Sequence, residues 1–171
     1  MVHRLCRPLV AVLVVFSVMV AGCGVGGPLD PPGTSPELAG TWADVGSSSV
    51  GCLHVDNTGD LTKATGGALL HAELGVEELN FDGAWRTGQF GSFPVEYAAI
   101  AEVTRTGDVV SFAMSLSFRS LGVSVGTYEV LVEGMYDGAT IDGTVTLDAD
   151  IPLADVEYSV SSDAVLARDG C

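Results

Sequence analysis

The sequence has 171 residues and a formal net charge of −15, which comes from 22 acidic and seven basic residues. Because a phosphate backbone is bound by clustered Lys and Arg, this composition excludes nucleic acid as a partner. The sequence contains three histidines and four cysteines that could act as metal ligands or nucleophiles.

The chain begins with a segment typical of a secretory signal. His3, Arg4 and Arg7 form a basic start, and an uncharged apolar run follows from Leu9 to Ala21. The run has the length of a signal-peptide core and is shorter than the roughly 20 residues of a membrane-spanning helix. We therefore predict that residues 1–22 are removed.

The end of this segment, Val20-Ala21-Gly22-Cys23, resembles the lipobox of bacterial lipoproteins. The resemblance implies cleavage between Gly22 and Cys23, a diacylglyceryl thioether on the Cys23 sulfur, and a further acyl chain (palmitate) on the new amino group. Two or three chains, at about 0.8 kcal/mol per buried methylene, make a stable membrane anchor. The alternative is an ordinary secreted protein in which a cysteine follows the cleavage site by chance.

The mature chain is expected to consist of a tether and one domain. Residues 23–36 are rich in Gly and Pro and show no apolar period, which indicates a flexible spacer. Residues 37–171 form the domain, because a chain of this size has enough apolar surface for one core and too little for two. Without the signal, five basic residues face all 22 acidic ones, a net charge of −17.

The domain shows the two-residue alternation of half-buried strands. The pattern is clear in Val110 to Arg119 and in Thr140 to Ile151, and it continues at Val156, Tyr158 and Val160. Asp-Gly and Asn-Thr-Gly turns separate such runs. Only Ala68 to Leu79 looks helical, and it could equally be two strands. We predict an all-β antiparallel meander of eight to ten strands, closed into a barrel, with a two-sheet sandwich as the alternative.

Two cysteines remain for the domain, Cys52 near its start and Cys171 at its end. In an extracytoplasmic protein such a pair predicts a disulfide. The bond would place the C-terminus beside the second strand, as expected where a meander returns to its own beginning. The competing interpretation, a metal bound by Cys52 and His54, lacks further ligands at suitable spacing.

Leu38-Ala39-Gly40-Thr41-Trp42, followed by a strand that ends in the turn Asp56 to Asp60, resembles the opening of lipocalin-like domains. The resemblance implies that Trp42 closes one end of a barrel and that Gly40 lets the chain approach it closely. It also implies an internal cavity for a small apolar ligand. The chain departs from the pattern because no clear helix follows the last strand.

The inward positions of the predicted barrel carry large side chains that could line such a cavity or simply fill it. They are Phe112, Met114, Phe118, Tyr128 and Tyr158. No ligand-binding residue can be assigned from the sequence.

No catalytic signature is present, and we predict neither an enzyme nor a cofactor. The sequence has no Gly-x-Ser-x-Gly elbow and no His-Glu-x-x-His motif. The carboxylate pairs Asp148 with Asp150 and Glu77 with Glu78 are interpreted as solvated charge rather than as glycosidase pairs. The turn Asp56 to Asp60 has oxygens for weak calcium binding but lacks the EF-hand spacing, so no metal site is predicted.

Two functional hypotheses follow for a lipoprotein of the bacterial envelope, facing the periplasm or the cell surface. In the first, the barrel binds a small apolar ligand. In the second, the domain is a non-catalytic structural or interaction protein that contacts another envelope protein, and an exposed apolar patch would favour it.

Overall fold

The computed structural model describes residues 35–46, 50–67, 74–90, 92–152 and 155–171. The predicted signal, the lipobox with Cys23 and almost all of the tether lie outside these residues. One 3₁₀ turn, η1 (Pro36–Leu38), precedes ten strands. These are β1 (Gly40–Asp44), β2 (Cys52–Val55), β3 (Leu61–Thr65), β4 (Glu78–Asn80), β5 (Arg86–Phe90), β6 (Phe93–Thr106), β7 (Val109–Ser120), β8 (Val123–Tyr136), β9 (Thr140–Ile151) and β10 (Val156–Arg168).

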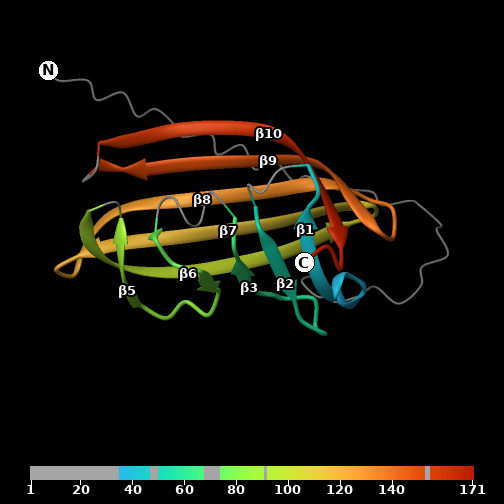
Figure 1. The fold of residues 1–171 in the computed structure, drawn as a ribbon, viewed down its shortest axis with the longest axis horizontal. Coiled ribbons are helices and arrows are strands. Elements are labelled where there is room, and N and C mark those ends of the chain that lie inside the picture. The colour runs from blue at the N-terminus through green and yellow to red at the C-terminus, as the bar shows by residue number, and fades with distance from the viewer. Residues whose placement is uncertain (1–34, 47–49, 68–73, 91, 153–154) are drawn as a thin grey trace, which may run out of the picture.

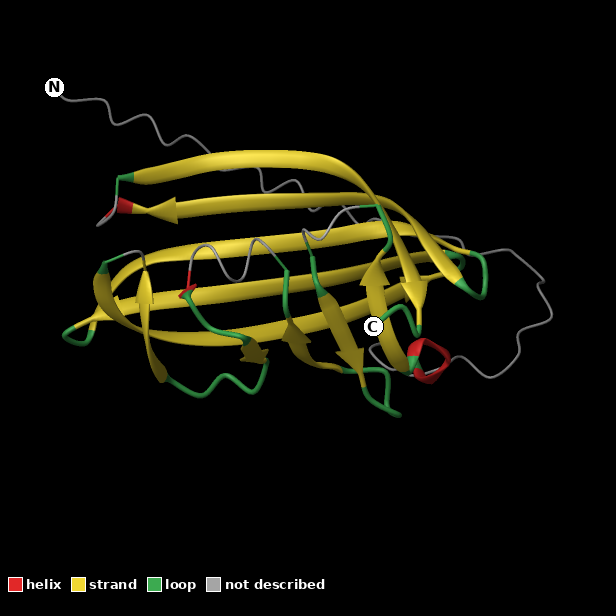
Figure 2. Cartoon of the chain, in the orientation of Figure 1, coloured by secondary structure: helices red, strands yellow, loops and turns green. Residues whose placement is uncertain are grey.

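All ten strands belong to one antiparallel sheet in the order β4-β3-β2-β1-β10-β9-β8-β7-β6-β5. Each strand pairs with the next along the chain, except β4 with β5, which form the two edges of the sheet. In addition, β1 pairs with β10. Figures 1 and 2 show the sheet curling, with the long strands β6–β10 on one side and the short strands β1–β4 across them. The prediction of an all-β meander is confirmed, as a curled half-barrel of one sheet rather than a two-sheet sandwich.

The alternation read from the sequence matches the burial of the long strands. In β7 the side chains of Val110, Phe112, Met114, Leu116 and Phe118 are at most 5% exposed, while the residues that alternate with them face outward. The predicted strand Thr140 to Ile151 has the bounds of β9, and its alternate residues, Ile141 among them, are buried. The buried faces of all the long strands join in one core with Trp42 of β1 and Leu53 of β2.

Two glycines that face each other allow β8 and β9 to approach closely. Gly134 pairs with Gly143, and a Cβ atom on Gly143 would lie 2.0 Å from the carbonyl oxygen of Glu133. No side chain fits at that distance without moving backbone. The pair therefore sets the separation of the two strands.

The two ends of the sheet approach each other through the segment that follows β4. The amide of Gly83 donates to the carbonyl of Ala99 over 2.9 Å, and Asp82 forms an isolated antiparallel bridge with Ile100. Both partners belong to β6, so the chain between β4 and β5 crosses the middle of that strand.

The predicted disulfide joins Cys52 of β2 to Cys171, with a Cα–Cα distance of 5.9 Å. β10 returns to pair with β1, where Trp42 lies opposite Arg168. The meander therefore ends beside its own beginning, as the cysteine pair predicted.

The structure differs from the sequence-based expectations, or describes them only in part, at two places. In the predicted segment Ala68 to Leu79, residues 68–73 lie outside the described part, and β4 begins at Glu78. In β10 the strand is confirmed, but Val160, expected on the core, is 56% exposed. The physical reason is that β1 pairs with β10 only at Leu166–Arg168, so no described strand extends the sheet beside Val160.

Candidate interaction surface

The interior side chains named from the sequence form packed core. Phe112, Met114, Phe118 and Tyr128 are each at most 5% exposed, and Tyr158 is partly buried against them. Phe118 also makes an edge contact with Phe90, with ring centroids 5.6 Å apart. Of the two roles considered for these residues, the geometry supports filling the half-barrel.

Trp42 is fully buried near η1, and its indole N–H donates to the carbonyl of Leu38 over 2.7 Å. The guanidinium of Arg168 lies 5.0 Å from the Trp42 ring and donates to the Tyr136 hydroxyl over 2.9 Å. Gly40 precedes this cluster with a φ of +132°, a region that L side chains rarely adopt. A glycine is needed at position 40 for this backbone conformation and not for close packing, because a Cβ there would make only an ordinary 3.8 Å contact.

The outer face of the sheet carries a hollow of about 620 Å³ along β7, which we name the β7 groove. Its floor is Ala113 and Ser115 of β7, and its walls belong to β6 and β8. The pairing register places Ser115 between Ile100 and Glu129, and Ala113 between Glu102 and Leu131. Small side chains between two rows of larger ones explain the depression.

The walls of the β7 groove combine apolar surface with negative charge. Ile100 is 58% exposed and Leu131 is 39% exposed, although both have large apolar side chains. Glu102, Glu129 and Asp148 border the same hollow. The hollow therefore brings two exposed apolar side chains next to three carboxylates.

Negative charge continues from the groove across the outer face to β10. A second hollow of about 500 Å³ adjoins it and is bordered by carboxylates, including Asp148 and Asp150. Both side chains are exposed, as expected for solvated charge. The exposed acidic residues that face outward from β8, β9 and β10 are Glu129, Glu133, Asp142, Asp148, Asp150, Glu157 and Asp163.

The basic residues of the domain are engaged elsewhere. Among the described residues four form ion pairs, which are Lys63–Glu78, Arg86–Asp82, Arg105–Glu37 and Arg119–Glu96. Arg168, the fifth, contacts Trp42 and Tyr136. None of these interactions uses an outward carboxylate of β8, β9 or β10, so the charge of this face has no basic partner among the described side chains.

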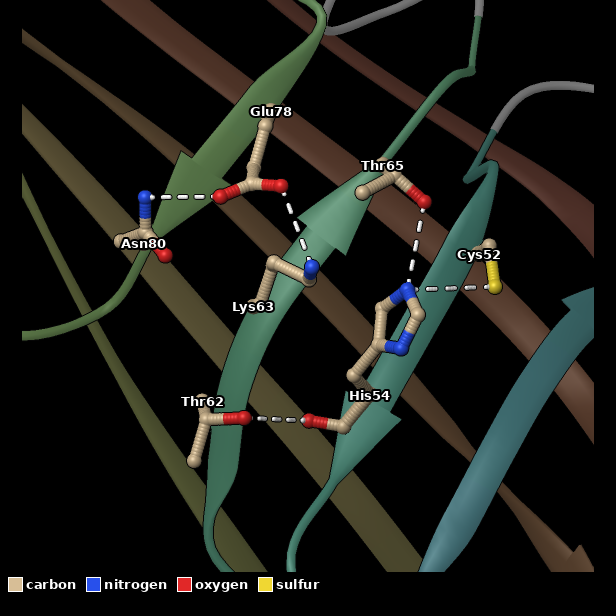
Figure 3. A network of polar contacts seen from close by, with 7 residues as sticks. All are labelled: Cys52, His54, Thr62, Lys63, Thr65, Glu78 and Asn80. Atoms are coloured by element: carbon tan, nitrogen blue, oxygen red, sulfur yellow. Dashed lines mark hydrogen bonds and ion pairs between the residues drawn. The ribbon is translucent and has the colours of Figure 1, made fainter.

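A polar network on β2–β4 includes Cys52 and His54, the two residues considered above as metal ligands (Figure 3). His54 Nε2 lies 3.5 Å from Cys52 Sγ and 3.2 Å from Thr65 Oγ1. Burial, and then the charge of Lys63, lower the pKa of His54. Because Cys52 is bonded to Cys171, its sulfur is not a thiolate ligand, and the interpretation of Cys52 with His54 as a metal site is wrong.

The remaining candidate sites are structural turns and pairs. One carboxylate oxygen of Asp56 accepts hydrogen bonds from the amides of Thr58 and Asp60, at 2.8 and 3.1 Å, and from the Thr58 hydroxyl, so it is occupied by its own turn. The hydrogen bond from Lys63 lowers the pKa of Glu78, which is the opposite of what a general acid needs. Within the described ranges, no group of three or more His, Cys, Asp or Glu is placed to hold a metal.

The β7 groove was not identified from the sequence, because the alternation of apolar and polar residues indicates only which face of a strand is exposed to solvent. The available signal was apolar residues on both faces of one strand, at Ala98 to Ala101 and at Val130 to Val132. A half-buried strand does not need a large apolar side chain on its solvent face.

No protein-family model, curated protein or solved structure matches this chain. In the part of the chain that the structure describes, no helix has the length and apolar character needed to cross a bilayer.

Proposed function

We propose that this protein is a non-catalytic interaction lipoprotein of the bacterial cell envelope, which binds another envelope protein through the β7 groove. The observation that carries the proposal is the exposed apolar surface of Ile100 and Leu131 inside an acidic rim. Large apolar side chains on the water-facing side of a sheet cost solubility and are typical of binding surfaces.

The packing of the interior favours this function over that of a small-ligand carrier. A carrier needs inward side chains that retract around a cavity. Here Phe112, Met114, Phe118 and Tyr128 are all buried in one continuous core. The exposed apolar surface is on the outside, where a protein partner can reach it.

The anchor belongs to the same proposal. Acylated Cys23 would hold the mature chain at a membrane, and residues 24–36 would connect it to the domain. In a proline-rich extended conformation this tether spans about 40 Å. That distance leaves the outer face of the sheet accessible to a protein in or near the same membrane.

We further propose that the half-barrel closes in a lipocalin-like manner, with the segment after β4 completing the wall against β6. The 2.9 Å hydrogen bond from Gly83 to Ala99 and the bridge between Asp82 and Ile100 support this closure. A closed wall would present the outer face as a rigid surface.

The test is photo-crosslinking in the bacterium that produces the protein, with a benzophenone amino acid at Ala113 on the groove floor. The control position is Asp108, an exposed residue in the turn between β6 and β7. We expect one defined protein adduct from Ala113 and none from Asp108.

The specificity of that adduct is tested with Leu131→Glu, which places a charge on the groove wall. The matched control is Leu121→Glu, because Leu121 is 100% exposed in the turn after β7. Leu131→Glu is expected to abolish the adduct and Leu121→Glu to retain it. Equal adducts from both positions, or an adduct that Leu131→Glu does not change, would refute the proposal.

A further inference from the structure

Among the strands that the structure describes, none pairs with the second edge of β10 along most of its length. It pairs with β9 from Val156 to Ala167, but β1 pairs with it only at Leu166–Arg168. The last contact before the strands separate is the hydrogen bond from the Val45 amide to the Val165 carbonyl, 2.9 Å long. Figure 1 shows this part of β10 as the upper border of the sheet, away from β1.

The register identifies the backbone groups that face the open side. The Val165 carbonyl points toward β1, and the N–H and C=O groups of every second residue of a strand point the same way. The pairing of β10 with β9 continues without a shift. The groups that face the opening therefore belong to Glu157, Ser159, Ser161 and Asp163, all of which are exposed.

Natural edges of this length are usually blunted by proline, by charged side chains, above all lysine, or by a bulge, and the charges on this edge, Glu157 and Asp163, are both acidic. Residues 156–164 contain no proline, no lysine and no register shift. The edge is therefore a ready template for another strand, and main-chain hydrogen bonds would supply the affinity.

The side chains along the edge indicate which strand would fit. Outward, Glu157 and Asp163 are six residues apart with two serines between them, next to the acidic surface of β9. Toward the core, Val160 is 56% exposed and would be covered by an apolar neighbour. A fitting segment has basic residues six positions apart, small residues between them on the same face, and an apolar residue at its centre on the other face.

A second copy of the chain fits poorly. Antiparallel pairing of this edge with itself, centred on Val160, places Glu157 opposite Asp163 twice, and like charges directly opposite each other are destabilising. A basic strand makes two favourable pairs at the same positions.

We propose that the open edge of β10 accepts one antiparallel strand from a cationic protein partner. The inference rests on the proposed interaction function and specifies how the partner is held and what charge it carries. The β7 groove and the edge belong to one continuous acidic face, so a single partner can reach both.

The first test measures amide hydrogen exchange by NMR on the mature, acylated chain in detergent micelles. In the free chain, we expect fast exchange at Glu157, Ser159, Ser161 and Asp163, and slow exchange at the residues between them, which bond to β9. Slow exchange at the first set would show that the edge is already occupied, by another segment of the chain or by a second copy, and would overturn the proposal.

The second test adds a blocked heptapeptide, KTTVTVK, with ETTVTVE as the charge-reversed control. KTTVTVK should slow exchange at the four open amides and bind at least about 2- to 30-fold more tightly than ETTVTVE, because two attractive cross-strand charge pairs alone give that range and the control adds two repulsive ones. Equal binding of the two peptides, or no change at these amides, would overturn the proposal.

A pair of variants at Ser159 distinguishes binding of the peptide to the β10 edge from binding elsewhere on the surface. Ser159→Pro removes an N–H that faces water, which an edge strand tolerates, while Ser159→Thr keeps it. KTTVTVK should bind Ser159→Thr and fail to bind Ser159→Pro, and unchanged exchange in β9 verifies the fold of both variants. Binding of KTTVTVK to Ser159→Pro as to the wild type would overturn the proposal.

The crosslink from Ala113 distinguishes the two proposals. If that adduct persists in Ser159→Pro while KTTVTVK binds no variant, the edge proposal fails and the interaction function stands. If no adduct forms even in the wild type, the interaction function itself fails.

Discussion

Replacing both disulfide cysteines with serine tests how strongly the half-barrel depends on its covalent closure. The bond joins residues 119 positions apart and lies where β2 and the C-terminus meet. In the chain-entropy account, a loop of that size contributes about 5 kcal/mol by restricting the unfolded chain. A domain of this size is stable by about 5–15 kcal/mol in total, so the double variant Cys52→Ser/Cys171→Ser should lose a large fraction of its stability.

The assay is equilibrium urea unfolding followed by tryptophan fluorescence, because Trp42 is fully buried and reports loss of the core. The matched control is the wild-type chain after reduction, which removes the bond and keeps both sulfur atoms. Both forms should be destabilised by about the same 5 kcal/mol. A loss of less than about 1 kcal/mol in both forms would contradict the chain-entropy value and refute the idea that the bond acts by restraining the unfolded chain.

Three further predictions concern single residues. Gly143→Ala should destabilise the fold by about 1–3 kcal/mol in the same urea assay, because the new Cβ would lie 2.0 Å from the Glu133 carbonyl oxygen; an unchanged midpoint would contradict this. The lowered pKa of His54 means that the unfolded chain takes up this proton first as the pH falls below 6.5. Stability should therefore decrease from pH 7 toward pH 5, and less so in His54→Gln; equal slopes would contradict it. Cys23→Ser should move the protein from the membrane fraction to the soluble fraction on an immunoblot, whereas a membrane-bound variant would contradict acylation at this residue.

The sequence was most informative where one face of a strand is buried and the other is wet. The range Val110 to Arg119 lies within β7 and the range Thr140 to Ile151 coincides with β9, because apolar and polar residues alternate along most of both. The return of the chain to its own beginning also followed from the sequence, since the cysteine pair places Cys171 beside β2, and the structure shows β10 paired with β1.

The exposure of Val160 could not be predicted, because it depends on where a distant strand ends. Alternation shows only that Tyr158 and Val160 point to the same side. Whether that side is covered depends on β1, which pairs with β10 no further than Leu166. The length of a neighbouring strand is a tertiary property that the pattern of β10 does not contain.

The β7 groove was missed for a related reason. Its shape comes from the register of three strands, which places Ala113 and Ser115 of β7 between larger residues of β6 and β8. Register depends on turn geometry and on the fit of the core, and a shift of two residues would keep the same faces buried while moving the groove walls. The sequence alone could not place Ile100 near Leu131.

We propose that the domain acts through its outer face while its interior is filled by its own side chains. The decisive experiment is native mass spectrometry of the acylated chain, transferred from detergent without denaturation. We predict the mass of the lipidated polypeptide alone, before and after incubation with a lipid extract. A discrete small molecule that survives purification and is lost on denaturation would contradict the claim and indicate a ligand carrier.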